Sequence, residues 1–179
     1  MKKVALLMAL FVALMFLAVN AEETNNYVGV KKCKMCHKSE KSGNQFGIWS
    51  ESPHAKAYET LGGEKAKEIA TGMDIENPQT SEKCLVCHVT AYGVPAEQKT
   101  ETLTLEESVS CEQCHGPGSA YKKIMKDHEK AVAAGLLVPD EKTCTVCHNE
   151  NSPTFKEFKY EERVKEIAHP KPKKEEAKG

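Results

Sequence analysis

The eight cysteines of the chain form four pairs of one kind, each followed directly by a histidine. The motifs are Cys33-Lys-Met-Cys36-His37, Cys84-Leu-Val-Cys87-His88, Cys111-Glu-Gln-Cys114-His115 and Cys144-Thr-Val-Cys147-His148. Two cysteines three residues apart can form thioethers along one edge of a porphyrin, and the next histidine then supplies the proximal iron ligand. The sequence therefore predicts four covalent haem c groups.

Other cysteine sites explain this pattern less well. Paired cysteines also bind zinc or iron–sulfur clusters, and exported proteins use cysteines in disulfides. None of these sites requires a histidine after every pair, and histidine occurs only seven times among 179 residues. All eight cysteines are used by the four motifs, so none is left for a disulfide or a reactive thiol.

A count of the histidines makes a further prediction. Four haem irons have eight axial positions, and the proximal histidines fill four of them. His54, His128 and His169 remain and are predicted as distal ligands. One haem then lacks a histidine from its own chain. Met73, water, an open site or a histidine of a neighbouring molecule are the alternatives for that position.

The two ends of the chain differ from its middle. Lys2 and Lys3 precede an apolar run from 4 to 19 and small residues up to Ala21, which predicts a signal peptide over residues 1–21. An uncleaved membrane anchor is the alternative. We expect a haem domain over 22–169 and a disordered charged tail over 170–179. The protein is predicted to lie in the periplasm or otherwise on the extracytoplasmic face, with no stable membrane insertion once the signal peptide is removed.

The composition predicts the fold class. Aromatic residues make up 6% of the chain, the mean hydropathy is −0.53 and the net charge is −1. A chain so poor in core residues needs a cofactor or another crosslink to fold. We expect a mainly α, compact multihaem cytochrome in which short helices surround four closely packed haems, with little or no sheet. Helices are predicted near 41–61, 63–71, 118–134, 139–148 and 155–168, and one short strand over 99–105. The charge balance does not suggest nucleic-acid binding.

The motifs and the residues around them resemble the tetrahaem cytochrome c-554 family of ammonia-oxidising bacteria. The similarity lies in Ser52-Pro53-His54-Ala55-Lys56-Ala57, in Cys111-Glu-Gln-Cys114-His115-Gly116-Pro117-Gly118, in Asp127-His128 and in the segment from Val164 to His169. The resemblance implies stacked haem pairs, three haems with two histidine ligands, and an open site at the haem of Cys84 and Cys87. It also implies a hydroxylamine oxidoreductase-like electron donor.

Three functions are compatible with these residues. The leading hypothesis is an electron carrier between redox proteins with no catalytic residues of its own, because no catalytic constellation is evident beside the motifs. The second is a reductase or oxidase of a small nitrogen ligand, such as nitric oxide, hydroxylamine or nitrite, at the haem that lacks a histidine. The third is a subunit of a haem filament, in which a neighbour supplies the eighth ligand.

Overall fold

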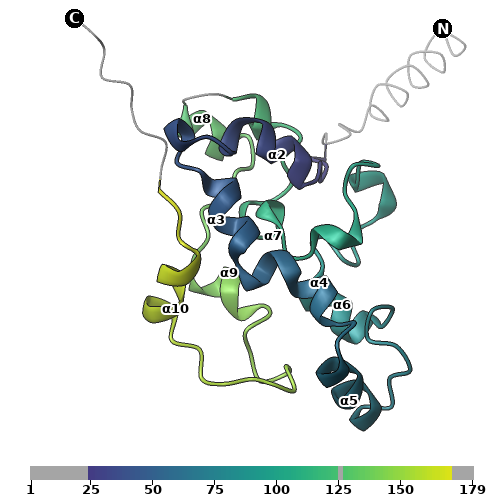
Figure 1. Cartoon of the computed structure of the whole chain (residues 1–179). Coiled ribbons are helices and arrows are strands. Elements are labelled where there is room, and N and C mark those ends of the chain that lie inside the picture. The colour runs from purple at the N-terminus through teal and green to yellow at the C-terminus, as the bar shows by residue number, and fades with distance from the viewer. Residues whose placement is uncertain (1–23, 125–126, 171–179) are drawn as a thin grey trace, which may run out of the picture.

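The computed structural model describes residues 24–124 and 127–170. This part of the chain contains nine short α-helices, of which the longest has nine residues, joined by 3₁₀ turns and loops (Figure 1). The helices are α2 (Val30–His37), α3 (Gln45–Glu51), α4 (Ala57–Thr60), α5 (Glu64–Gly72), α6 (Glu82–His88), α7 (Cys111–His115), α8 (His128–Ala133), α9 (Glu141–Thr145) and α10 (Tyr160–Ile167). The 3₁₀ turns are η1 (Glu40–Ser42), η2 (Pro53–Lys56), η3 (Ala96–Gln98), η4 (Leu105–Glu107) and η5 (Tyr121–Lys123). The predicted mainly α fold is confirmed.

Over the described residues, pairing between extended segments is limited to one β-bridge, between Tyr27 and Lys99. The predicted signal peptide, and the predicted tail apart from Pro170, lie outside these residues. None of the helices in the described ranges is long and apolar enough to cross a bilayer.

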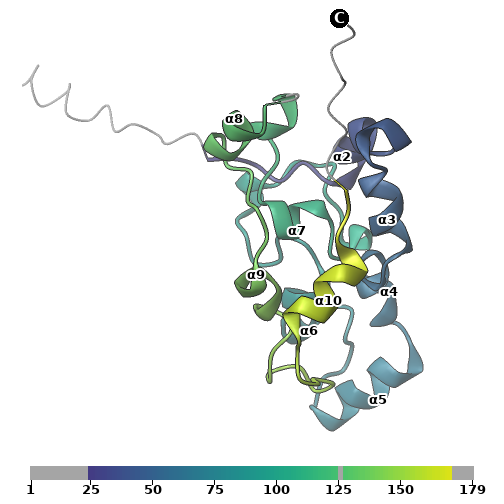
Figure 2. The ribbon, with the colours of Figure 1, turned by 90° about the vertical axis from the view of Figure 1, so that its left-hand side faces the viewer.

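Helices α2, α3, α4 and α5 follow one another as a column from one end of the molecule to the other (Figure 2). Helix α7 lies in the middle and contacts α2, while α6 contacts α4. Three of the four cysteine motifs are contained in the helices α2, α6 and α7, and the fourth begins in α9. These contacts connect three of the four motifs to the column of helices.

Few apolar side chains are buried in the described part of the chain. The buried hydrophobic residues of the described ranges are Val28, Val30, Leu61, Ala70, Leu85, Val89, Ala91 and Ala131. The hydrophobic cluster consists of Leu61, Leu85 and Val89, with Tyr58, Cys84 and Tyr92 packed against it. A domain of this size normally buries far more apolar surface than these residues provide.

A buried carboxylate joins the N-terminal segment to the third motif. The side chain of Glu112 is 1% exposed. Its Oε1 accepts hydrogen bonds from the Val28 N–H at 2.9 Å and the Gly118 N–H at 2.6 Å, and its Oε2 accepts from the Gly29 N–H at 2.8 Å. Three backbone donors that would otherwise lack partners are thereby satisfied. This contact fixes the start of α2 against α7.

A second polar cluster precedes the third motif. Thr90, Ser108 and Ser110 are each no more than 2% exposed. The Thr90 hydroxyl donates to the Ser108 carbonyl at 2.9 Å and accepts from the Ser110 N–H at 2.7 Å. The Trp49 indole donates to the Val109 carbonyl at 2.8 Å. Segment 108–110 therefore links the chain after the second motif to the column of helices.

Several predicted helices are shorter in the structure. The helix predicted over 41–61 is interrupted at Ser52, whose ψ of 158° is extended because a residue before proline avoids the helical region. Pro53 begins η2, and the Ser52 hydroxyl donates back to the Trp49 carbonyl instead of capping this turn. Helix α5 matches the prediction over 63–71.

The helix predicted over 118–134 is also wrong in extent. Ile124 is extended and ends η5, and α8 begins only at His128. The Asp127 side chain accepts from the Lys130 N–H at 3.0 Å and so caps α8. Met125, within the range of the predicted helix, lies outside the described residues. Helices α9 and α10 are shorter than the predicted 139–148 and 155–168.

The strand predicted over 99–105 does not form. The Thr100 N–H and hydroxyl both donate to the Tyr27 carbonyl, at 2.9 and 3.0 Å. The Thr102 hydroxyl donates to the Val28 carbonyl at 2.7 Å. Side-chain hydroxyls thus bond to the neighbouring backbone where a sheet would use a ladder of N–H groups, and the segment turns away after one bridge.

Candidate haem-binding sites

Each motif folds as about one turn of helix, and the four are named sites I (33–37), II (84–88), III (111–115) and IV (144–148). Residues three and four apart lie on one face of a helix, so both cysteines and the histidine of a motif face the same way. At site IV the assigned helix ends at Thr145, but the His148 N–H still donates to the Cys144 carbonyl at 3.0 Å. All four motifs therefore present their ligands alike.

Site IV has a strong N-terminal cap. The Asp140 carboxylate accepts from the Thr143 N–H at 3.0 Å, while the Asp140 N–H donates to the Thr143 hydroxyl at 3.2 Å. This capping box fixes the first turn of α9 immediately before Cys144. The backbone hydrogen bond from Thr143 also lowers the pKa of the Asp140 carboxyl, so the cap is ionised at neutral pH.

No disulfide joins the eight cysteines, all of which lie within the described ranges. Their thiols meet across motifs. The hydrogen bond between Cys33 and Cys111 raises the pKa of Cys33 and lowers that of Cys111. Burial, followed by the nearby Cys87 sulfur, raises the pKa of Cys147 to about 12. The sulfurs of site I thus lie beside those of site III, and those of site IV beside those of site II.

Sites III and IV are also neighbours. Burial, followed by the charge of Cys144 and then of Cys111, raises the pKa of the Cys114 thiol to about 11. Together with the two contacts above, this places the sites in the spatial order I, III, IV, II. That order differs from the order of the motifs in the sequence.

Three of the motif histidines are held through Nδ1. The ring of His88 bonds to the Ala57 carbonyl at 2.7 Å, and that of His115 to the Leu137 carbonyl at 3.0 Å. His37 Nδ1 lies 3.1 Å from Gln45 Oε1. Because these oxygens accept a hydrogen bond, Nδ1 carries the proton and Nε2 is free to bind a metal.

Two of the predicted distal histidines lie opposite motif histidines. The ring centroids of His54 and His148 are 5.8 Å apart, as are those of His115 and His169. Two imidazoles on opposite sides of one metal ion have centroids roughly 6 Å apart, because each metal–nitrogen bond is about 2 Å long. Both pairs have the separation that an iron between them needs.

The surroundings of these four histidines favour the neutral ring. Burial lowers the pKa of His54, His115, His148 and His169, and in each case a neighbouring imidazole or arginine acts in the same direction. The ring of His148 also stacks on Phe158, with centroids 4.8 Å apart. A metal binds only the unprotonated nitrogen of a histidine, so these shifts favour ligation at neutral pH.

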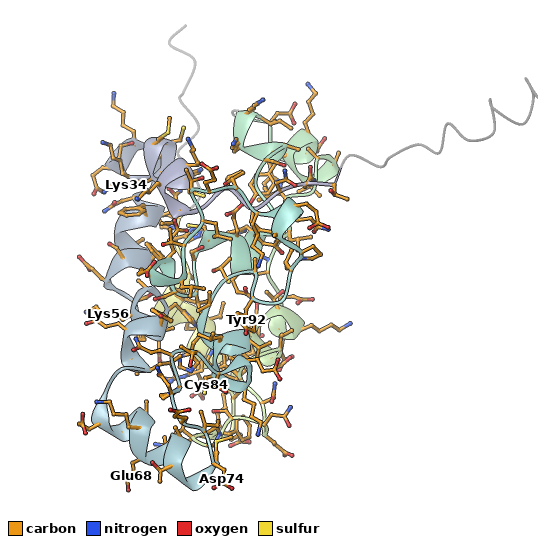
Figure 3. All side chains as sticks on the ribbon, turned by 90° about the vertical axis from the view of Figure 1, so that its right-hand side faces the viewer. Lys34, Lys56, Glu68, Asp74, Cys84 and Tyr92 are labelled. Carbon is orange, nitrogen blue, oxygen red and sulfur yellow. The ribbon has the colours of Figure 1, made fainter. Side chains whose placement is uncertain are left out.

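The remaining candidates are less closely placed. His128 is exposed at the first position of α8. His37, His88 and His128 take part in no ring pair within the described ranges. Met73 follows α5 and is 36% exposed. Figure 3 shows Cys84 of site II near Tyr92, in the region of the small hydrophobic cluster.

The residues fit haem c. Each site offers two free thiols at the required spacing and a histidine on the same face. Three of these histidines are oriented through Nδ1, and two have a second imidazole opposite. The small apolar core also leaves the interior to a large apolar group. When bound, haem c would supply a one-electron iron centre at each site.

Comparison with known proteins identifies the family. Residues 32–116 match the family described as cytochrome c554 and c-prime. Cytochrome c-554 of Nitrosomonas europaea is 31% identical over 142 residues, which span 68% of this chain and 57% of that protein. The structure of reduced cytochrome c554 from the same organism superposes with a TM-score of 0.58 at 27% identity, covering 80% of this chain and 83% of that one.

The chain belongs to the cytochrome c-554 family. The family match confirms the resemblance inferred from the motifs, and it makes the chain a tetrahaem c-type cytochrome with four haem c groups. The chain spans a little over half the length of the curated relative that it matches.

Sequence reasoning did not find two kinds of residue in this cytochrome c-554 fold. The carbonyls of Ala57 and Leu137 orient histidines, but a backbone acceptor has no sequence signal. Glu112, inside the third motif, joins sites I and III through backbone contacts. The one available signal was an acidic residue between two haem cysteines, and a charge there is normally expected on the surface.

Proposed function

We propose that the protein carries electrons between redox proteins through four haem sites in the order I, III, IV, II, without substrate chemistry of its own. The observation that carries this proposal is the closeness of the motifs: cysteines of different motifs alter one another's pKa, and Glu112 of site III is hydrogen-bonded to the backbone at the start of α2. Groups tethered to adjoining sulfurs lie close together, and closely spaced redox centres form a continuous path for electrons.

The proposed ligands follow from the ring pairs. Cys33, Cys36, Cys84, Cys87, Cys111, Cys114, Cys144 and Cys147 attach the haems, and His37, His88, His115 and His148 are the proximal ligands. His54 serves site IV and His169 serves site III, as their 5.8 Å centroid separations support. Sites I and II remain for His128. The family resemblance implies that the haem of Cys84 and Cys87 is the open one, so His128 is assigned to site I and site II keeps one axial position without a histidine.

The ligand set predicts the redox properties. Histidine at both axial positions gives lower potentials than histidine with methionine. Sites I, III and IV should therefore have low to middling potentials. The chain's own residues favour the neutral form of the paired imidazoles and orient His37, His88 and His115 through Nδ1.

Electron paramagnetic resonance of the oxidised protein, combined with a potentiometric titration, tests this proposal. We expect three low-spin haems and one high-spin haem, magnetic interaction between neighbouring centres, and four electrons taken up per chain. Four magnetically isolated haems would contradict the relay. Four low-spin haems would contradict the ligand assignment.

A second candidate function rests on site II. His88 is held by the Ala57 carbonyl, and three distal histidines cannot serve four irons. A small ligand such as nitric oxide, hydroxylamine or nitrite would bind at this position, and reduction of that ligand is the alternative function. Addition of nitric oxide or cyanide to the reduced and oxidised protein decides it, because a spectrum that does not change excludes an accessible site.

The pairing of His169 with His115 within one chain favours a self-contained protein over a haem filament. The apolar run at residues 4–19 supports export and an extracytoplasmic location, where haem c is attached. N-terminal sequencing of the exported protein tests cleavage after Ala21. A hydroxylamine oxidoreductase-like donor remains a prediction from the family resemblance.

A further inference from the structure

Charge is unevenly distributed along the molecule. The whole chain has a net charge of −1, but residues 30–43 contain five lysines and one glutamate. Residues 57–76 contain five acidic residues and two lysines. Figure 3 shows Lys34 at one end of the molecule and Glu68 and Asp74 at the other. Site I therefore lies at a basic end and site II beside an acidic end.

The basic end is defined by six lysines of α2, its C-terminus, η1 and η5: Lys31, Lys32, Lys34, Lys38, Lys41 and Lys122. All six side chains are exposed. Met35, between the two cysteines of site I, is 72% exposed, and Cys36 is exposed as well. An apolar centre ringed by charge at a redox site is what a small, transient protein interface needs.

Part of this surface is hollow. A groove of about 470 Å³ lies beside α2, and its lining contains Lys32, Lys99 and Lys122 with one acidic residue, Glu101. At the same end, the Lys34 ammonium is held 4.7 Å from the centroid of the Phe46 ring. The groove is positive and suits a carboxylate from another protein.

The described part of the chain ends beside the basic end. The Gln45 side chain donates to the Pro170 carbonyl at 3.0 Å, so the chain arrives beside the start of α3 at this end.

We infer that the basic end around site I is the docking surface for an acidic redox protein. The inference rests on the proposed electron transfer and adds the chemistry and place of the partner. A local positive surface on a chain of nearly zero net charge orients an acidic protein during encounter, and it raises the association rate in a salt-dependent way. The basic end thus makes site I, at one end of the relay, the point of electron exchange.

Two variants of equal charge change test the inference. One carries Lys32→Glu, Lys38→Glu and Lys122→Glu at the basic end and leaves the residues between the cysteines intact. The control carries Lys65→Glu, Lys67→Glu and Lys83→Glu, which lie on α5 and α6. Haem content and far-UV circular dichroism verify that all three proteins are folded.

The probe is a reduced plant-type ferredoxin, a small acidic electron donor. Its second-order rate constant is measured by stopped flow over a range of salt concentrations, and binding of oxidised ferredoxin is measured by calorimetry. We expect the rate constant of the basic-end variant to be at least about tenfold lower than that of the wild type at low salt. The variant should also show no measurable binding of oxidised ferredoxin, and its rate constant should no longer fall as the salt concentration rises. The control should lose less than about threefold.

The outcomes separate the two proposals. If dithionite, a small reductant, does not reduce all four haems of the wild type, electron transfer itself is wrong. If dithionite reduces them but both variants slow equally with ferredoxin, or neither slows, the docking surface is wrong. Self-association of the wild type at low salt that the basic-end variant abolishes and the control keeps would assign the basic end to a second copy of the chain, and would also overturn the inference.

Discussion

Replacing Glu112 by glutamine should destabilise the haem-loaded protein by about 3 kcal/mol. The carboxylate is 1% exposed and accepts from Val28, Gly29 and Gly118 at distances of 2.6 to 3.0 Å. Glutamine has a single acceptor oxygen, and its amide NH₂ would face backbone donors. The change removes a hydrogen bond to a charged group, worth about 1.5–3 kcal/mol, and leaves one buried N–H unpaired at roughly 1–3 kcal/mol.

Guanidinium unfolding followed by far-UV circular dichroism and by Soret absorbance measures this loss. At roughly 2–4 °C for each kcal/mol in a domain of this size, the melting temperature should also fall by about 6–12 °C. The matched control is Glu97→Gln in η3, an exposed position where a change should stay within about 0.5 kcal/mol. If Glu112→Gln is no less stable than this control, the buried carboxylate is not what holds α2 against α7.

Four further outcomes are expected. Gly29 and Gly93 both have φ near +80°, but a Cβ on Gly29 would lie 2.5 Å from the Thr102 carbonyl oxygen, while Gly93 faces open space. Gly29→Ala should therefore lose about 1–3 kcal/mol more stability than Gly93→Ala in denaturant unfolding. Equal losses would contradict the close approach. Burial raises the pKa of Glu107, so ionisation of this carboxyl lowers the stability of the fold as pH rises above the unfolded-state value of 4.5, and the loss persists above the folded-state value. The stability of Glu107→Gln should therefore increase relative to that of the wild type between pH 4.5 and pH 7. A difference in stability that does not change with pH would refute this. His169→Ala should raise the high-spin haem count by one in electron paramagnetic resonance, and an unchanged count would remove His169 from site III. The chain made without haem attachment should show no cooperative thermal unfolding, because its own apolar core is small; a sharp transition would contradict that reasoning.

The four motifs could be located from the sequence alone, but the path of the chain between them could not. Cysteine spacing and the adjacent histidine are local features, and each motif does fold as a helical turn. Two of the three spare histidines, His54 and His169, do lie opposite motif histidines. The pairing itself needed the structure, because it joins residues 54 and 148, and 115 and 169, which no local pattern relates.

Helix lengths were predicted poorly for a physical reason. The predicted periodic stretches included Ser52 before a proline and Asp127, a good helix cap, and both interrupt the helices. A short strand was predicted over 99–105, yet the hydroxyls of Thr100 and Thr102 bond to the backbone of residues 27 and 28. In a protein with a small apolar core, such local polar contacts decide where an element ends.

The same polar contacts also set the order of the haem sites. Glu112 joins the segment before site I to site III, and the hydrogen bond from His115 to Leu137 ties site III to the chain that leads into site IV. A single turn connects sites IV and II, because His54 faces His148 while Ala57, three residues later, accepts from His88. Each step of the order I, III, IV, II thus has its own fixed contact in the protein. Few apolar side chains are available to position the sites, so these polar contacts are what the chain contributes to the spacing of the relay. A shift of the turn 54–57 would therefore disturb sites IV and II at once.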